Sequence, residues 1–492
     1  MRFNYTIDDL RKYYQKTVES SERLFLKGDY EGSIKCVRAA AILQYNLNDI
    51  FVDSKVNHLL KTIADRLDST PQNNIILDSN CVFFIDYYGI DNRGLTQQYL
   101  DAIVSRFRGA TIVYIHESSF TSRGVNINAY LKKNNIETYE LGKVSEVEKV
   151  LLINEIILKY KPLRVFFHLH PAKSLSPIIA FYSFPSILKY QINITDHAFW
   201  LGGPDFFNYS IEFRKYGAYL SLNKREFEQN QLRIIPYYPW QEKGTFDGFP
   251  IDTHDKIVLF AGGFLYKIEG EGNTFLDIAK RITEMDDRVV FFMAGGGNPH
   301  YFEEYVNNNN LHKKFYYIGD RHDINEVFNR VDIFLGTYPL GGGLMTQLAA
   351  VNSKPILLYK GFDNKELFLK PDKIDFIYQT IEDLLIEAEQ LVKDSSYRRQ
   401  RGAIAKELII SPQQFKRLFD ELIDNHPSES DKFYDNQLDM SYIYSTYLKR
   451  INEGRFGVYL ECLLLATTKR IFGIKQILNI ILNILELKMF LT

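Results

Sequence analysis

A strand, a glycine run, a helix and a second strand follow one another between residues 331 and 358, and this order constrains the fold more than any other feature of the sequence. The short apolar run Val331–Leu335 predicts a buried strand of a parallel sheet. After Tyr338 and Pro339 come three glycines, Gly341, Gly342 and Gly343. Leu344–Val351 then predicts a helix, and the apolar residues after Pro355 predict another strand. The unit predicts an α/β fold with a parallel sheet.

A glycine loop that leads into a helix is one way to build an anion site. Bare backbone N–H groups approach a phosphate closely there, and the helix dipole favours negative charge. The spacing matches neither the P-loop, since no Gly-Lys-Ser/Thr follows, nor the dinucleotide fingerprint. The same glycines would also serve as the plain turn of a crossover. Taken alone, the glycines leave both interpretations open.

The residues upstream of the loop add a resemblance to a known family. Phe315–Leu335 contains a strand ending near Gly319, a basic residue, a short helix and the start of the next strand. Together with the glycine loop and Lys354-Pro355, this order resembles the nucleotide-sugar half of GT-B glycosyltransferases. The pattern of Thr337, Pro339, a Gly-Gly pair and Thr346 is most similar to O-GlcNAc transferases and bacterial N-glucosyltransferases. The resemblance covers residues 257–360 well and the N-terminal half only loosely.

The resemblance implies two Rossmann-like domains that face a cleft and a nucleoside-diphosphate sugar bound by the second domain. In such enzymes a glycine turn after the first strand of that domain faces the diphosphate. Here the turn offers Lys267, while Phe264 stands where an arginine is expected. Arg321 follows a later strand and suits bidentate contact with phosphate. For both cations the alternative is a solvated loop charge.

The candidate donor-binding residues are Lys267, Arg321, Gly341, Gly342, Gly343, Leu344, Met345, Thr346 and Gln347. Many GT-B relatives carry a Glu-x7-Glu pattern, and Gln347 and Leu348 lie where its second glutamate would be. The ribose-binding acid of that branch is therefore absent, and Gln347 is a candidate substitute. This leaves retaining versus inverting chemistry open.

Length, composition and charge limit the classes of protein to which the chain can belong. A chain of 492 residues predicts two or three domains, and a hydrophobic content of 46% supports sizeable cores. The net charge of -2 argues against broad nucleic-acid binding. Cys36, Cys81 and Cys462 lie far apart, which favours a reducing compartment and offers no metal site. The N-terminus has no apolar core of a signal peptide, so we expect a cytoplasmic protein.

Four segments are predicted. Residues 1–72 form a helical extension with a hairpin turn near Gly28, and docking onto the next domain is its expected role. Residues 73–240 form a first Rossmann-like domain that holds the acceptor, and residues 241–425 form the nucleotide-sugar domain. Residues 426–492 form C-terminal helices. The expected strands are Cys81–Ile85, Thr111–Ile115, Asn135–Leu141, Arg164–His168, Gln191–Thr195, Lys256–Phe260, Arg288–Met293, Lys314–Ile318, Asp332–Leu335, Pro355–Tyr359 and Phe376–Tyr378.

Polar residues collect where strands of the first domain end, which is where parallel sheets bind ligands. They include Asn92, Arg93 and Gly94 after the first strand. Asp196 and His197 are the catalytic candidates, because an imidazole beside a carboxylate offers a base near neutral pH. Adjacent residues rarely point the same way, so no dyad is implied. His197 could instead bind the donor or cap a buried turn. His168 and His170 alternate on one strand face and belong to a substrate cleft or to the structure.

The C-terminal tail is unusually apolar from Phe456 onward, yet charges interrupt it before the ~20 residues that a transmembrane helix needs. Lys469, Arg470 and Lys475 could meet anionic lipid head groups on the inner face of the membrane. The alternative is a last helix that packs back on the first domain.

These features together predict a metal-independent glycosyltransferase with no cofactor, of the kind used in polysaccharide biosynthesis. It would move a sugar from a nucleoside-diphosphate sugar to a glycan, lipid-linked or protein acceptor. The alternatives are a non-catalytic nucleotide-sugar-binding or scaffold protein and a GT-B-shaped nucleotide-sugar epimerase.

Overall fold

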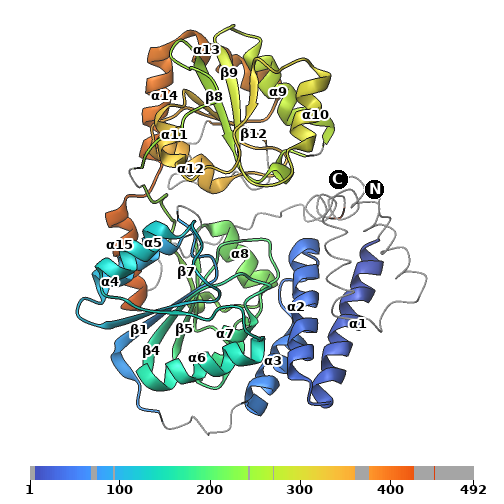
Figure 1. Cartoon of the computed structure of the whole chain (residues 1–492), viewed down its shortest axis with the longest axis vertical. Coiled ribbons are helices and arrows are strands. Elements are labelled where there is room, and N and C mark those ends of the chain that lie inside the picture. Colours follow the sequence, from blue (N-terminus) through green and yellow to red (C-terminus); the bar gives the residue numbers. More distant parts are fainter. Residues whose placement is uncertain are drawn as a thin grey trace. The chain divides into compact units, whose positions relative to one another are not determined.

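The computed structural model describes residues 6–67, 75–91, 95–241, 244–269, 271–360, 376–425 and 448. The chain divides into two compact units. The first comprises Met1–Ile90, Ile103–Ile234 and Asn425–Thr492, and the second comprises Asp91–Ala102 and Ile235–Asp424. Each unit is built around its own parallel sheet (Figure 1).

The sheet of the first unit has seven strands in the order β3-β2-β1-β4-β5-β6-β7, and every recorded pair is parallel. The order reverses between β1 and β4, which makes this the topological switch point of the sheet. The strands are β1 (Asp78–Asp86), β2 (Thr111–His116), β3 (Glu137–Glu140), β4 (Pro162–His168), β5 (Leu188–Ile192), β6 (Tyr209–Glu212) and β7 (Leu232–Ile234). The helices that precede and connect them are α1 (Ile7–Leu26), α2 (Tyr30–Leu47), α3 (Ser54–Leu67), α4 (Thr96–Arg106), α5 (Val125–Lys133), α6 (Glu146–Tyr160), α7 (Leu175–Tyr182) and α8 (Lys215–Lys224).

The N-terminal helices share a hydrophobic core with this sheet. Ile34 and Val37 of α2 and Leu60 of α3 belong to the same buried cluster as Phe83 and Phe167 of the strands. Helix α2 is also tied to the start of α6 by polar contacts. Residues of the helical extension therefore dock on the first sheet, as expected from the single hairpin.

The second unit has a six-stranded parallel sheet in the order β10-β9-β8-β11-β12-β13, with its switch point between β8 and β11. Its strands are β8 (Ile257–Gly262), β9 (Val289–Ala294), β10 (Phe315–Tyr317), β11 (Ile333–Leu335), β12 (Ile356–Tyr359) and β13 (Ile377–Tyr378). Its helices are α9 (Thr274–Thr283), α10 (His300–Asn308), α11 (Ile324–Asn329), α12 (Gly343–Val351), α13 (Ile381–Lys393), α14 (Ser395–Glu407) and α15 (Pro412–Ile423).

Alternation along the strands explains why helices cover both faces of this sheet. Ile257 and Leu259 of β8 point into one buried cluster, together with α9, α10 and α13. Val258 and Phe260 point into a second cluster with α11, α12 and α14. Because successive side chains of a strand face opposite ways, apolar residues at every position require a helical layer on each side.

The predicted α/β class with two parallel sheets is confirmed. The prediction differs most from the structure at four strands of the first unit. Strand β5 begins at Leu188 and ends at Ile192, earlier than the predicted Gln191–Thr195, and strands β6 and β7 were not anticipated. The short strand predicted at 135–141 is reduced to Glu137–Glu140.

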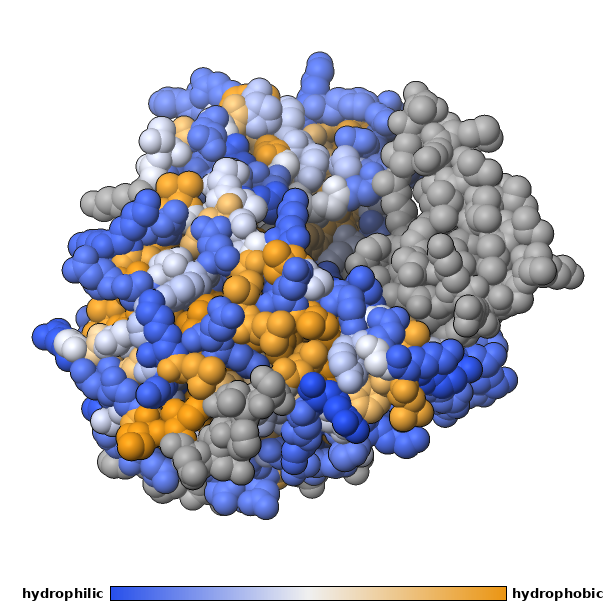
Figure 2. Space-filling view, turned by 60° about the horizontal axis from the view of Figure 1, so that its bottom comes forward, coloured by the Kyte–Doolittle hydropathy of each residue, from blue (hydrophilic) through white to orange (hydrophobic). Residues whose placement is uncertain are grey.

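The C-terminal tail from Phe456 and the loop residues Asn92, Arg93 and Gly94 lie outside the described residues. In the part of the chain that is described, no helix is long and apolar enough to cross a membrane. Figure 2 shows hydrophobic side chains gathered near the middle of the face turned forward, with hydrophilic side chains around them. The large aliphatic residues that α6 exposes are Leu151, Leu152 and Leu158.

Candidate functional site

The glycine loop lies at the switch point of the second sheet. Strands β8 and β11 are neighbours there, and the loops that follow them are Gly263–Lys267 and 336–342. Ligands of open α/β sheets bind outside the carboxyl ends of the strands at such a point. Helix α12 begins directly after the loop, with Gly342 as its N-cap. The arrangement of strand, glycine loop and helix predicted from the sequence is confirmed.

Lys267 joins the two loops at this point. Its Nζ donates a hydrogen bond to the carbonyl oxygen of Gly341 at 2.5 Å, and the Leu340 N–H donates to the Lys267 carbonyl at 3.3 Å. The ammonium group therefore lies against the glycine run. In the structure described here it fixes the position of the loop. A ligand shared by Lys267 and the glycine run stays a prediction.

A third loop, after β9, approaches the same place closely. The Gly263 N–H donates to the Ala294 carbonyl at 3.0 Å, and the Leu265 N–H donates to Gly296 at 3.0 Å. A Cβ at Gly295 would lie 1.7 Å from the Gly263 carbonyl oxygen, so only glycine allows this approach. The structure thus places Gly295 in close packing between the two loops.

The first residues of α12 are held from within the unit. The Thr346 hydroxyl donates back to the Gly342 carbonyl at 3.2 Å, and Gln347 Nε2 donates to the Tyr237 carbonyl at 3.4 Å. Leu344 and Met345 are half-buried against the cluster under the helix. A Cβ at Gly262 would meet Met345 Cε at 2.3 Å, so the turn after β8 and the helix start touch.

Arg321 has a structural use in this unit. Its guanidinium donates to the Asp323 carboxylate at 2.7 and 2.6 Å and to the Gly248 carbonyl at 2.8 Å. It also lies over the Phe246 ring, 5.5 Å from the centroid. These contacts hold residues 246–248 against the sheet. A contact between Arg321 and a nucleotide, which stays a prediction, would have to compete with them.

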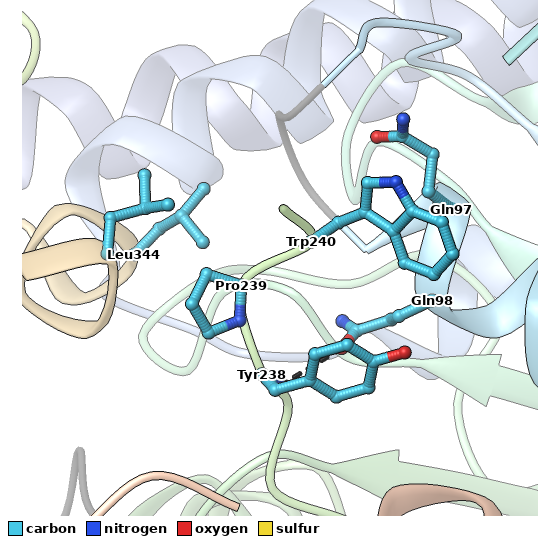
Figure 3. A pocket seen from close by; sticks show the side chains of 7 residues that line it. Gln97, Gln98, Tyr238, Pro239, Trp240 and Leu344 are labelled. Carbon is cyan, nitrogen blue, oxygen red and sulfur yellow. Dashed lines mark hydrogen bonds between the residues drawn. The ribbon is translucent and has the colours of Figure 1, made fainter. Parts of the chain in front are cut away.

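A small pocket lies beside the start of α12, within the second unit (Figure 3). The Tyr238 N–H donates to Gln98 Oε1 at 3.0 Å, and the Tyr238 hydroxyl is buried without a hydrogen-bond partner. The sequence analysis named none of the residues of this pocket except Leu344 and Leu348, and the aromatic run Tyr237-Tyr238-Pro239-Trp240 was the signal that could have marked it. The lining residues are Gln97, Gln98, Tyr238, Pro239, Trp240, Leu344 and Leu348.

The catalytic candidates lie in the first unit, in the loop between β5 and β6. His197 is buried, and its Nδ1 is hydrogen-bonded to the Tyr216 hydroxyl of α8 at 2.7 Å. The Asp196 carboxylate accepts from Arg214 Nε at 2.6 Å. Each of the two neighbours thus has its own partner. The carboxylate is neutralised by a guanidinium, which makes His197 the better candidate for a base.

A buried polar network fixes this loop. Arg225 donates to the Asp196 and Ala198 carbonyls, and Glu212 accepts from Ser221 at 2.6 Å and from Asn193 at 2.6 Å. Burial lowers the pKa of Arg225 to about 10 and raises the pKa of Glu212. The position of His197 is therefore set by hydrogen bonds on both sides of the loop.

His168 and His170 have different surroundings. His168 Nδ1 lies 2.9 Å from the Asp86 carboxylate, both side chains are 0% exposed, and Asp86 also accepts from the Tyr114 hydroxyl at 2.7 Å. These bonds hold the pKa of Asp86 near 2, against the burial that would raise it. His168 is thus structural, whereas His170 is half-buried and lies among tyrosine rings. Within the described ranges, no group of three or more His, Cys, Asp or Glu could hold a metal ion.

Comparison with known proteins finds similarity at the level of structure. No family model and no curated protein matches the sequence. An O-GlcNAc transferase mutant from Thermobaculum terrenum aligns with a TM-score of 0.52 and 12% identity, over 84% of this chain and 80% of that one. HepE of Anabaena, in complex with UDP and glucose, aligns with a TM-score of 0.51 and 12% identity, over 70% and 99%.

A third solved structure extends the comparison. A TarM mutant of S. aureus, in complex with Fondaparinux, alpha-GlcNAc-glycerol and UDP, aligns with a TM-score of 0.51 and 10% identity, over 70% of this chain and 99% of that one. At such low identity the alignments establish architecture, and they agree on it with the two parallel sheets described above. The chain therefore has the fold of the GT-B glycosyltransferases.

Proposed function

We propose that the chain is a glycosyltransferase that moves a sugar from a nucleoside-diphosphate sugar to a glycan, lipid-linked or protein acceptor. The observation that carries the proposal is the glycine loop at the switch point of the second sheet, held by the bond between Lys267 and Gly341. A glycine loop, the N-terminus of α12 and the Lys267 side chain meet there. This combination suits a diphosphate.

The chemistry of the transfer explains why such a loop is needed. Cleavage of the bond between sugar and diphosphate leaves negative charge on the departing phosphate oxygen. Donors that already point at this position stabilise the charge without reorganising during the reaction. We assign this role to the amides of Gly341, Gly342 and Gly343 and to Lys267, with Leu344–Gln347 supporting the loop from α12.

We assign the acceptor to the first unit. His197 is the proposed base that takes a proton from the acceptor hydroxyl, or the group that positions the donor sugar. Asp196, paired with Arg214, would act by holding the loop in place. Gln347 is proposed to take the place of the missing ribose-binding acid, which would require its bond to the Tyr237 carbonyl to rearrange.

The test has two stages. A thermal-shift screen against UDP, GDP, ADP and TDP and their sugars comes first, because a ligand that binds only the native state raises its stability by mass action. The nucleotide sugar that gives the largest shift is then incubated with the protein, and the products are separated. Release of the nucleoside diphosphate with a new glycoside supports transfer.

The other products identify the alternatives. A nucleotide sugar that is bound but returned unchanged, with every acceptor class supplied, would point to a binding or scaffold protein. An isomerised nucleotide sugar would point to an epimerase. If no nucleotide shifts the melting temperature, the proposed donor site itself is wrong.

We also keep the proposal that the tail from Phe456 rests on a membrane surface on the cytoplasmic side. Co-sedimentation with anionic liposomes, for the full chain and for a chain ending at Gly454, tests it. Equal pelleting of both, or a full chain that stays in the supernatant, contradicts it.

A further inference from the structure

A group of aromatic side chains lies at the switch point of the first sheet. The loop after β1 supplies Tyr87 and Tyr88, the loop after β4 supplies His170, and α2 supplies Tyr45. The ring centroids are 5.1 Å apart for Tyr87 and Tyr88, 5.1 Å for Tyr87 and His170, and 4.9 Å for Tyr45 and His170. All four residues are half-buried, so each keeps part of its surface accessible.

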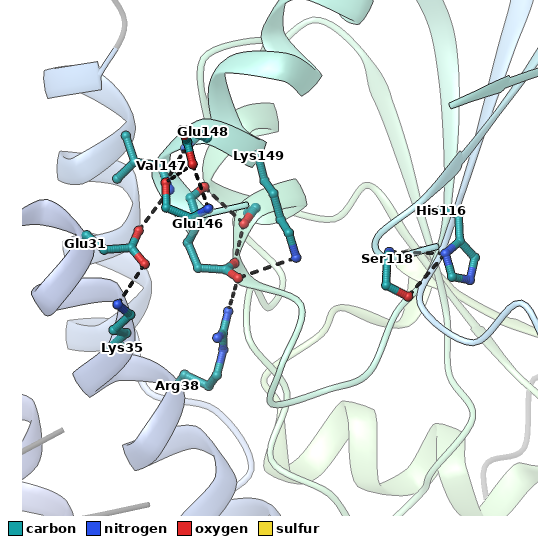
Figure 4. Close-up of polar contacts among 11 residues, drawn as sticks. Glu31, Lys35, Arg38, His116, Ser118, Glu146, Val147, Glu148 and Lys149 are labelled. Atoms are coloured by element: carbon teal, nitrogen blue, oxygen red, sulfur yellow. Dashed lines mark hydrogen bonds and ion pairs between the residues drawn. The ribbon is translucent and has the colours of Figure 1, made fainter. Parts of the chain in front are cut away.

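Polar contacts explain why α2 can contribute to this edge. Arg38 Nη2 lies 2.5 Å from the Glu146 carboxylate at the start of α6, and the Val147 N–H donates to Glu31 at 3.1 Å. Figure 4 shows Arg38 and Lys149 reaching the Glu146 carboxylate from two sides. The helix that carries Tyr45 is thus fastened to the body of the unit.

His170 is a neutral hydrogen-bond donor in this group. The Ala172 N–H donates to its Nδ1 at 3.1 Å, so the ring proton is on Nε2. Burial and the nearby charge of Lys173 lower the pKa of His170 to about 3, which keeps the ring uncharged at neutral pH.

Two ionisable groups border the rings. Glu117, which follows β2, is 6% exposed, and its Oε1 is buried without a hydrogen-bond partner. Lys173 is half-buried, and burial and the charge of Arg38 lower its pKa. Among the described residues, none bonds the Lys173 ammonium, whereas Arg38 and Lys149 are both paired with Glu146. Burial raises the pKa of Glu117 to about 8, so Lys173 gives the group an excess of positive charge.

We propose that these residues, which we name the Tyr88 subsite, bind an anionic sugar unit of the acceptor. The members are Tyr45, Tyr87, Tyr88, Glu117, His170 and Lys173. Tyrosine and histidine faces suit the C–H face of a pyranose ring. The buried Glu117 carboxyl and His170 Nε2 suit its hydroxyl groups, and Lys173 suits a carboxylate or phosphate on the same unit. The inference rests on the proposed function, because it names the acceptor class of that reaction.

Position and charge support this assignment. The subsite lies where parallel sheets bind ligands, between strands β1 and β4. A buried carboxyl oxygen without a partner costs free energy, and an aromatic group that served only to pack α2 on the sheet would not need one at Glu117. A bound sugar with an anionic substituent would supply a partner for this oxygen and for the half-buried ammonium of Lys173.

The experiment measures binding of single sugar units by saturation-transfer NMR. The probes are methyl β-D-glucuronide, α-D-glucose 1-phosphate and the neutral methyl β-D-glucopyranoside, titrated into the full chain. We expect at least one anionic probe to bind about tenfold more tightly than the neutral one, from one charge-assisted hydrogen bond. Lys173→Met should remove this preference, and Tyr45→Ala should weaken all three probes.

Lys159→Met is the matched control, because Lys159 also lies beside tyrosines, with its Nζ 2.9 Å from the Tyr139 hydroxyl. It should bind the probes like the wild type. Circular dichroism and melting temperature show whether each variant is folded. If Tyr45→Ala destabilises α2, Tyr45→Phe replaces it, because that variant keeps the ring. A response to only one anionic probe identifies the carboxylate or the phosphate as the natural group.

Three results overturn the inference. They are no saturation transfer to any probe, equal affinity for neutral and anionic probes, or an unchanged preference in Lys173→Met. UDP is titrated in parallel, so that a failure of the Tyr88 subsite can be distinguished from a failure of the proposed function. UDP binding without sugar binding rejects the Tyr88 subsite alone, whereas the absence of nucleotide binding counts against the donor site.

Discussion

The Nζ of Lys267 lies 2.5 Å from the carbonyl oxygen of Gly341, and this bond joins residues 74 positions apart in the sequence. It connects the turn after β8 with the loop that precedes α12. A single side chain thus fixes the Gly341 carbonyl of the glycine loop, and it brings its own positive charge to the same place.

Lys267→Met tests the importance of that bond. The variant loses the charge and releases the loop, so we expect the affinity for UDP, or for the nucleotide that the screen selects, to fall about tenfold. Isothermal titration measures it. Lys280→Met is the control, because Lys280 bonds Asn309 on the same unit, away from the loop. Equal affinities of the two variants would contradict the assignment.

Gly342→Val should block the donor site while the fold is retained. A Cβ at Gly342 would lie 3.4 Å from the Gly262 carbonyl oxygen and 3.5 Å from Thr337 Oγ1, which are ordinary contacts that the fold should accept. The methyl groups of valine are expected to occupy the space proposed for phosphate oxygens. We expect the affinity for the nucleotide to fall at least about tenfold, which corresponds to about 1.4 kcal/mol of binding free energy. The control is Gly244→Val, where a Cβ would meet only Glu326 Cγ at 4.0 Å. Unchanged nucleotide affinity in Gly342→Val would sink the prediction.

His197→Ala should abolish most of the transfer reaction. Loss of a general base typically costs ~10²–10⁴ in rate. Tyr216→Phe keeps the imidazole and removes only its hydroxyl partner, so we expect a smaller loss. Rates are measured at saturating donor, and the affinity for the nucleotide serves as the control for folding. If turnover of His197→Ala stays within a few-fold of wild type, the role assigned to His197 is wrong.

Gly217→Ala should destabilise the first unit through the loop that carries His197. A Cβ at this position would lie 2.3 Å from Asp196 Oδ1 and 2.7 Å from Glu212 Oε2, and both carboxylates are already held by other bonds. We expect a loss of ~1–3 kcal/mol in the free energy of unfolding. Gly109→Ala is a poor control because of its positive φ, whereas Glu155→Ala on the exposed face of α6 is a suitable one. If the melting temperature of Gly217→Ala equals that of wild type, the hydrogen-bond network around Asp196 and Glu212 adjusts to the new methyl group without loss of stability.

The strands that were predicted carry continuous apolar runs, whereas the missed strands β6 and β7 do not. β1, β4, β8 and β9 carry continuous apolar runs because helices cover both faces of each sheet. β6 carries Ser210 and Glu212, which are buried only because Ser221 and Asn193 bond the glutamate. Those partners come together only in the folded unit, so local sequence gives no sign of them. β7 has three residues with an arginine in the middle.

The glycine loop of the second unit was easier to predict than the features of the first unit. The order of strand, glycine loop and helix predicts the neighbourhood of Gly341 and α12 directly, since it is a local feature. The pairing of Arg321 with Asp323 lies two residues away and could have been suspected from the spacing. The contact between the rings of Tyr45 and His170 could not have been suspected from the sequence, because it depends on how α2 packs on the sheet.

Glu117 should make the stability of the first unit depend on pH. Its ordinary pKa is 4.5, and burial raises the pKa in the native state to about 8. Between these values the unfolded chain is ionised at this position and the native state keeps its proton. The native state therefore binds more protons, and the free energy of unfolding falls as pH rises. The contribution is complete below pH 4.5 and is lost as pH rises through about 8.

Glu117→Gln removes this titration, because an amide has the size of the carboxyl group and carries no ionisable proton. The free energy of unfolding of the variant, relative to that of wild type, should therefore rise between pH 5 and pH 8.5. The total rise should be ~2–4 kcal/mol. Urea unfolding followed by tryptophan fluorescence measures it, with Trp200 reporting on the first unit. Glu155→Gln, on the exposed face of α6, is the control and should keep a constant difference from wild type. A difference between Glu117→Gln and wild type that does not change with pH would mean that Glu117 is already ionised in the native state, and the excess positive charge assigned to its surroundings would disappear.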